Sequence, residues 1–191
     1  MNSVSPIAEA ESHDILKDGT HVTVRALHPD DIELERRFIE ALSPKSRRFR
    51  FLETMRSPSA ALLKQMTVID PSTDVAYVAL LGAGPQATEI GVGRFSAQAD
   101  GHDCEFAVTV SDEWQNKGLG TLLMQRLIEA AKTRGIKAMH SSDAADNTQM
   151  RQFADHLHLA HRRDPDDATL VRYSLDVGQS DADAGARSQQ P

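Results

Sequence analysis

The sequence predicts a single α/β (α+β) domain, and three observations lead to this fold class. Strand-like and helix-like runs are mixed from about residue 15 to residue 177, without a repeat or a linker between them. The chain has 191 residues, of which 40% are hydrophobic and 26% charged, as is usual for one globular domain. Residues 1–14 and 178–191 are polar and have little to bury, so we expect flexible ends on either side of a 15–177 domain.

The first third of that domain contains one strand and three helical segments. Residues 21–27, HVTVRAL, alternate apolar and polar side chains, which predicts a strand. Residues 28–42 have Pro29 and acidic residues in the first turn and apolar residues at helical spacing, which predicts a helix. Residues 43–53 and 57–69 each open with Ser-Pro, a helix-start signal, and so predict two more helices.

The remainder alternates between strands and helices. Glycine-containing turns divide three β-rich runs, 74–82, 89–97 and 103–110, into strands. A long amphipathic helix follows, with leucines on one face that would pack on a sheet. These later segments are predicted as helix 118–134, strand 137–142, helix 147–157 and strand 168–177.

Composition excludes several classes of function. A net charge of −7 gives no reason to expect nucleic-acid binding, and no apolar run is long enough to span a membrane. The first residues lack the features of a secretory signal, and the single cysteine, Cys104, fits a reducing compartment, so we expect a cytoplasmic protein. His156, His158 and His161 do not have a spacing that converges on one ion, so no metal site is predicted.

The turn before helix 118–134 has the chemistry of a phosphate site. Gly118 and Gly120 allow the backbone to approach a ligand closely, and Lys117 adds positive charge beside the free N–H groups of a helix N-terminus. A plain connecting turn is the alternative. Leu123 stands where a dinucleotide fingerprint needs its third glycine, and no P-loop sequence occurs in the chain.

The pattern Gln115-x-x-Gly118-x-Gly120, between a strand and a helix, resembles motif A of the GNAT acetyltransferase superfamily. EFAVTV (105–110) and NTQMRQFADHLHL (147–159) resemble the segments on either side of that motif, and EFAV is similar to the bacterial Pat-type protein-lysine acetyltransferases. The resemblance implies a mixed, mostly antiparallel sheet, flanked by helices, with a splay between the fourth and fifth strands. It also implies acetyl-CoA as co-substrate, an amine acceptor (a protein lysine or a small amine), no metal, and a monomer or homodimer.

The resemblance further implies roles for single residues. Backbone groups of Val108 to Val110 would bind the pantetheine arm, and the Val108 N–H would stabilise the oxyanion. Asn147 would lie near the cofactor thiol, although Asn is also an ordinary helix N-cap. The complete set of cofactor-binding residues is Val108, Thr109, Val110, Gln115, Asn116, Lys117, Gly118, Leu119, Gly120, Thr121 and Asn147.

Glu105 is the candidate general base. Strand alternation places Glu105, Ala107 and Thr109 on one face and Cys104, with Phe106, on the other, where the cysteine would be an inert core residue. A lysine-like amine is only about 0.1% neutral at pH 7.4, so the reaction needs a group that removes a proton. The alternative for Glu105 is a salt bridge or a solvent-exposed strand end.

The sequence departs from the family in one catalytic position and leaves the function class open. Many GNAT enzymes have a tyrosine, as general acid, on the helix after the Asn, but here Phe153 and Ala154 occupy those positions. His140 is predicted as an interior or cleft histidine and is the next candidate base. A non-catalytic module that binds acyl-CoA is the alternative to an enzyme, and the carboxylate of Glu105 favours the enzyme.

Overall fold

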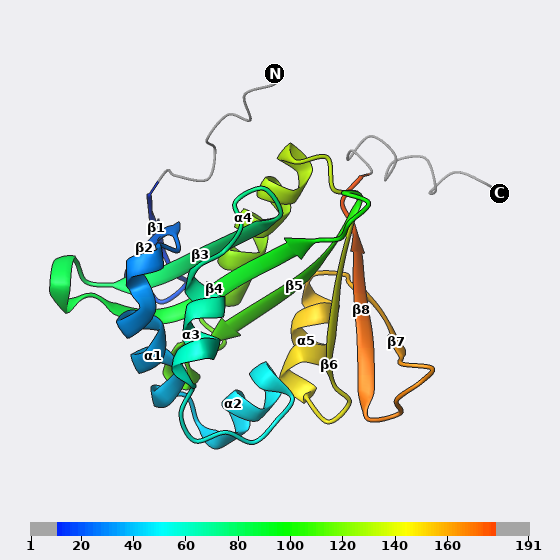
Figure 1. Cartoon of the computed structure of the whole chain (residues 1–191), viewed down its shortest axis with the longest axis horizontal. Coiled ribbons are helices and arrows are strands. Elements are labelled where there is room, and N and C mark those ends of the chain that lie inside the picture. The colour runs from blue at the N-terminus through cyan, green and yellow to red at the C-terminus, as the bar shows by residue number, and fades with distance from the viewer. Residues whose placement is uncertain (1–10, 179–191) are drawn as a thin grey trace.

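The computed structural model describes residues 11–178, so the expected flexibility of residues 1–10 and 179–191 lies outside the described part. Its centre is an eight-stranded sheet in the order β1-β2-β3-β4-β5-β6-β8-β7 (Figure 1). Every neighbouring pair is antiparallel except β5 and β6, which confirms the mixed, mostly antiparallel sheet. The strands are β1 Ser12–Ile15, β2 His21–Ala26, β3 Asp74–Leu81, β4 Thr88–Ala97, β5 Asp103–Val110, β6 Ala138–Ala144, β7 Ala160–Arg163 and β8 Leu170–Asp176.

Helices cover both faces of the sheet. α1 and α3 pack together on one face, and α4 lies across β3, β4 and β5 on the other (Figure 1). The helices are α1 Ile32–Ala41, α2 Pro44–Phe51, α3 Ala60–Thr67, α4 Leu119–Thr133 and α5 Thr148–His156, with short 3₁₀ turns at Pro29–Asp31, Gly84–Gln86 and Asp112–Trp114.

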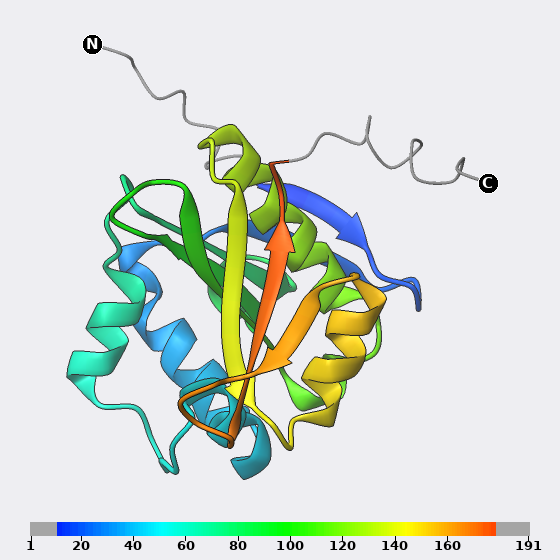
Figure 2. The same cartoon turned by 90° about the vertical axis from the view of Figure 1, so that its right-hand side faces the viewer.

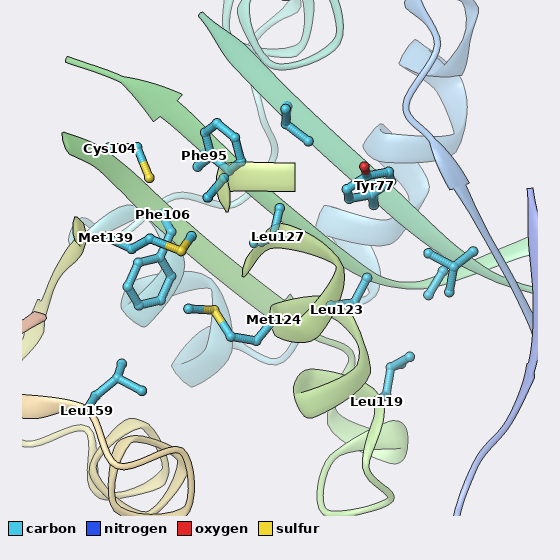
Figure 3. Close-up of a cluster of buried hydrophobic side chains, with 14 of the residues drawn as sticks. Tyr77, Phe95, Cys104, Phe106, Leu119, Leu123, Met124, Leu127, Met139 and Leu159 are labelled. Carbon is cyan, nitrogen blue, oxygen red and sulfur yellow. The ribbon is translucent and has the colours of Figure 1, made fainter. Parts of the chain in front are cut away.

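Two hydrophobic clusters hold these layers together. On the α4 face, Leu119, Leu123 and Leu127 are fully buried and belong to one cluster with Phe95 and Phe106 of the sheet (Figure 3). Burial of each such side chain contributes about 1.5–3 kcal/mol. On the opposite face the apolar sides of α1 and α3 cover β3 and β4, with Phe38, Ile39, Leu42, Leu63, Met66, Val78 and Val92 at the centre.

Glycine in β4 brings α4 close to the sheet. A Cβ atom at Gly93 would lie 3.2 Å from Leu123 Cβ and 3.3 Å from Leu127 Cδ1. Those contacts are tighter than ordinary van der Waals packing, so a larger residue would push the helix away. Because the loop before α4 is anchored to this helix, the packing also positions the loop.

The predicted elements are present, with some differences at their boundaries. The helix predicted from residue 28 starts as a 3₁₀ turn, and α3 begins at Ala60 with Ser59 as N-cap rather than at Ser57-Pro58. Two strands were not predicted. β1 includes residues 12–14, which were assigned to the flexible N-terminus, and β7 forms an exposed outer edge. Both are four-residue strands with no fully buried position, so they lack an alternating apolar signal.

The sheet opens between β5 and β6. These two strands pair only from Asp103↔Ala138 to Glu105↔His140, and beyond that point they diverge (Figure 1). β6 instead continues its pairing with β8 as far as Ala144. β5 and β6 are the fourth and fifth of the predicted strands, because β1 was not predicted. The splay implied by the family resemblance is therefore confirmed.

Candidate active site

A cleft of about 490 Å³ occupies the splay. It is lined by α2, the diverging half of β5, the loop before α4, the end of β6, and α5. Most of the predicted cofactor-binding residues line it, although they come from segments separated by up to about 40 positions; these are Val108, Thr109, Val110, Gln115, Asn116, Gly118, Gly120, Thr121 and Asn147, together with Glu105.

The backbone of β5 has free hydrogen-bonding groups that point into this cleft. Gln98 N–H donates to Asp103 O at the start of the β4–β5 ladder, and Ser111 N–H donates to Ile90 O at its end. In an unbroken antiparallel ladder, every second residue of β5 from Asp103 to Ser111 has its N–H and C=O directed at β4. The residues between them direct these groups the other way. The N–H and C=O of Val108 therefore face the splay, beyond the last residue paired with β6.

The same parity corrects the expectation for Thr109. Its N–H and C=O point toward Val92 of β4, so its backbone is engaged in the sheet and cannot bind a pantetheine arm. Thr109 nevertheless lines the cleft. The prediction of three consecutive backbone ligands overlooked the two-residue period of a strand.

The loop before α4 has the conformation of an anion cradle. Asn116 and Gly118 both have positive φ values, 62° and 93°, and Gly118 is the N-cap of α4 without a side-chain cap. The first amides of α4 consequently have no partner from a capping side chain, and their dipole favours an anion. Gln115 Nε2 donates to Val110 O over 3.1 Å, which ties the loop to the end of β5.

Lys17 is a cleft residue that the sequence analysis missed. It lies two residues after the end of β1, its Cγ lies 3.3 Å from where a Cβ of Gly118 would be, and its N–H donates to Lys117 O. Lys117 itself turns away from the cleft: its Nζ lies 3.2 Å from Asp18 and 4.3 Å from the centre of the Trp114 ring. Lys17, and not Lys117, therefore lies along the cleft side of this loop. Leu119, another predicted ligand, has its side chain fully buried in the core.

Asn147 is the N-cap of α5 and is also bound to Asp143. Its Oδ1 accepts from Met150 N–H at 3.1 Å, and its Nδ2 donates to both Asp143 oxygens at 3.1 and 3.0 Å. Burial raises the pKa of Asp143, and the hydrogen bond from Asn147 opposes this. Both ends of the Asn147 amide are therefore engaged within the protein. Asp143 lines the cleft as well, and no sequence motif indicated it.

Glu105 stands at the point where β5 and β6 separate. Its side chain is exposed and borders both the cleft and a second hollow of about 610 Å³. That hollow lies on the face of β6, β8 and β7 seen in Figure 2, which has no helix over it, and its lining includes His140, Ser142, Arg162, Arg172 and Ser174. Glu105 thus touches two spaces that meet at the end of the splay.

Two other candidates differ in their outcome. Of the two predicted settings for His140, interior or cleft, the structure shows the second: it is exposed, lines the second hollow, and its Nε2 lies 3.5 Å from Asp103. Cys104 is fully buried as expected, and burial raises the pKa of its thiol to about 12, so it is not a nucleophile.

Within residues 11–178 no cluster of His, Cys, Asp and Glu could hold a metal ion. None of the helices in that part is both long and apolar enough to cross a membrane.

Comparison with known proteins assigns the family. The model of the acetyltransferase (GNAT) family matches residues 47–158. The chain is 42% identical over 160 residues to Acetyltransferase PA5475 of Pseudomonas aeruginosa, covering 84% of this chain and 86% of that protein. It is also 31% identical over 133 residues to Acetyltransferase Pat of Mycolicibacterium smegmatis, covering 68% of this chain but only 38% of that longer protein.

A solved structure agrees with this assignment. The GNAT domain of S. lividans PAT superposes with a TM-score of 0.79 at 25% identity, covering 87% of this chain and 96% of that domain. The splayed sheet, the loop before α4 and the matched family therefore lead to one conclusion: the chain belongs to the GNAT acetyltransferase family and is similar to its Pat-type members.

Proposed function

We propose that this protein is an N-acetyltransferase that moves the acetyl group of acetyl-CoA directly to an amine, and that the acceptor is a protein lysine. The position of Glu105 carries the proposal, because its carboxylate borders both the cofactor cleft and the hollow beside it. An acceptor amine in that hollow would reach the carboxylate and the thioester from one side. The similarity to Pat-type proteins supports a protein acceptor over a small amine.

Different cleft residues would bind the cofactor, remove a proton from the acceptor and stabilise the oxyanion. The loop 115–121 and Lys17 would hold the pyrophosphate, and the open edge of β5 at Val108 would bind the pantetheine arm. Glu105 would accept one proton from the acceptor ammonium and pass it to water. The amine nitrogen would then form a bond to the carbonyl carbon while Val108 N–H donates to the carbonyl oxygen. As the C–S bond breaks, one of the two protons left on the nitrogen goes to the CoA sulfur and the other stays on it, leaving a secondary amide and a thiol.

The proposal is tested by thiol release from acetyl-CoA with purified protein, using lysine-containing peptides and small amines as acceptors. Mass spectrometry of lysate proteins incubated with the enzyme and labelled acetyl-CoA would identify the acceptor lysines. We expect the labelled acetyl group on specific lysines of proteins in a cytoplasmic extract. Binding of acetyl-CoA with no thiol release and no labelled product would instead identify a non-catalytic acyl-CoA-binding module.

A further inference from the structure

We propose that Arg50 is a carboxylate-binding residue in the cleft, so that the preferred substrate carries a carboxylate near the groups that react. The proposal rests on the acyl transfer proposed above and specifies the substrate class for the same site. Arg50 belongs to the last turn of α2 and lines the cleft together with Glu105.

The guanidinium of Arg50 has no anionic partner. Within residues 11–178 it makes no hydrogen bond and no ion pair, although its neighbours on α2 do, and it lies over the Phe51 ring, 5.1 Å from the ring centre. Arg48 binds Asp146 at 2.6 Å, and Arg47 donates to Arg56 O at 2.7 Å. An arginine normally uses its five donors when it is removed from water. The donors of Arg50 are therefore available to a ligand in the cleft.

The charges around Arg50 make an anionic ligand favourable. Burial, with the nearby charge of Arg94, lowers the pKa of Arg50 to about 10, so the guanidinium remains protonated at neutral pH. Glu35 and Glu105 act on it in the opposite direction, but neither is in contact with it. Arg50 is half-buried, so its guanidinium is partly removed from water with no anion in contact, and a ligand carboxylate would offset that cost.

The location favours a carboxylate over a phosphate. The loop before α4 (115–121), which is the proposed pyrophosphate site, and Lys17 lie beyond the far end of β5. At about 3.3 Å per residue, the strand from Glu105 to Val110 is about 16 Å long. Arg50 instead lies near Glu105, whose negative charge would repel a dianion more than a monoanion. One planar guanidinium matches one carboxylate through two parallel hydrogen bonds.

The carboxylate could belong to the acyl group or to the acceptor, and two arms of one experiment separate these sources. In the donor arm, succinyl-CoA is compared with butyryl-CoA, which has the same number of acyl carbons but no terminal charge. In the acceptor arm, with acetyl-CoA as donor, L-lysine is compared with L-lysinamide and L-aspartate with L-asparagine. Each is measured as kcat/KM with the wild-type chain, with Arg50→Gln and Arg50→Lys, and with the control Lys45→Gln, which changes an exposed residue of the same helix.

We expect one arm to show a preference for the carboxylate-bearing compound of about 10- to 100-fold, as is usual for a charge-assisted pair. Arg50→Gln should abolish the preference, Arg50→Lys should retain part of it, and Lys45→Gln should leave it unchanged. Wild-type enzyme with no preference in either arm, or a preference that survives in Arg50→Gln, overturns the inference. Absence of both acetyl-CoA binding and turnover would refute the proposed function, and the inference with it.

Discussion

At the scale of single residues, the cleft distinguishes side chains of the same type by their neighbours. Lys17 reaches the loop before α4, while Lys117 is held by Asp18 and Trp114. Arg50 has no ion pair within residues 11–178, while Arg48 is paired with Asp146. Because of such differences, the same substitution should affect the reaction at one position and not at the other. Each pair of residues therefore supplies a test variant and its control.

Glu105→Gln tests the general base. It keeps the size of the side chain but cannot accept a proton, so turnover should fall on the order of 10²–10⁴-fold. Acetyl-CoA affinity should barely change, because the proposed backbone contacts lie further along β5. Near-normal turnover would show that the proton leaves elsewhere, and His140, in register with Glu105, would be tested next.

Lys17→Gln and Lys117→Gln remove the same charge from opposite sides of one loop. We expect Lys17→Gln to weaken CoA binding about tenfold, the effect of losing one charge-assisted contact. Lys117→Gln should change it by less than about twofold, because an exposed ion pair contributes little. Calorimetric titration with CoA measures both. An equal or reversed effect would contradict the placement of Lys17 beside the pyrophosphate.

At the scale of elements, α4 is built to present its N-terminus. Its buried leucines fix it on β4 and β5, and glycines with positive φ mark both ends, Gly118 at 93° and Gly135 at 76°. Only the first of these lines the cleft.

Gly118→Ala and Gly135→Ala therefore separate backbone strain from ligand binding. Each should lower the free energy of unfolding by about 1–2 kcal/mol, because alanine disfavours a positive φ. Only Gly118→Ala should also weaken CoA binding, since its Cβ would face Lys17 at the phosphate loop, whereas a Cβ at Gly135 meets no atom within 4 Å. Denaturant unfolding and calorimetry measure the two quantities, and loss of CoA affinity in both variants would refute this role for the loop.

A second feature at this scale joins α1 to β4. Glu35 and Glu89 are buried, and their four carboxyl oxygens have no hydrogen-bond donor among the described residues. Burial raises the pKa of both groups, and for Glu89 the neighbouring Glu35 raises it further, with Asp31 adding to this and Arg25 opposing it. Arg94 and Arg50 face Glu35 and lower its pKa in part. The pair is thus expected to retain a proton in the folded protein.

This pair makes stability depend on pH in a defined direction. A carboxyl group whose pKa rises on folding contributes stability fully below its unfolded pKa, near 4.5, and loses it as pH rises through the folded value. The side chain of Glu89→Gln cannot ionise. The difference in free energy of unfolding between this variant and wild type should therefore shift in favour of the variant as pH rises above about 5, by up to about 1.4 kcal/mol per pH unit. The exposed Glu113→Gln is the control. Parallel curves for wild type and Glu89→Gln would contradict the shared proton.

At the scale of the whole molecule, the splay divides one sheet into two parts that are hydrogen-bonded only near one end. β1–β5 lie between two hydrophobic clusters, whereas β6, β8 and β7 leave one face open beside Glu105 (Figure 2). A ligand in the cleft would contact both parts and should stabilise the fold as a unit.

Acetyl-CoA should therefore raise the melting temperature. At 100 times the dissociation constant, a ligand that binds only the folded state adds about 2.7 kcal/mol, which for a domain of this size is about 5–10 °C. Differential scanning fluorimetry across a CoA series measures the shift, with adenosine as a control that lacks the pyrophosphate and pantetheine. No shift at saturating acetyl-CoA would argue against the cleft as the binding site.

The sequence by itself determined the elements with strong local signals and the motif that lies between two of them. The strand ending at Val110, the turn with Gly118 and Gly120, and the amphipathic helix after it are adjacent in the chain, so their order alone predicts an anion site. The alternation of Cys104, Glu105 and Phe106 likewise placed the carboxylate opposite the core. These properties depend on neighbours within a few residues.

Only the tertiary structure decided which distant residues complete the site. Lys17 precedes Gly118 by about 100 positions, and Arg50 precedes Glu105 by about 55; no local periodicity relates members of either pair. β1 and β7 form because an existing strand edge offers backbone partners, which polar residues can use without an apolar pattern. The direction of the Thr109 backbone was likewise decided by its pairing with β4, because hydrogen-bond parity belongs to the sheet and not to the strand alone.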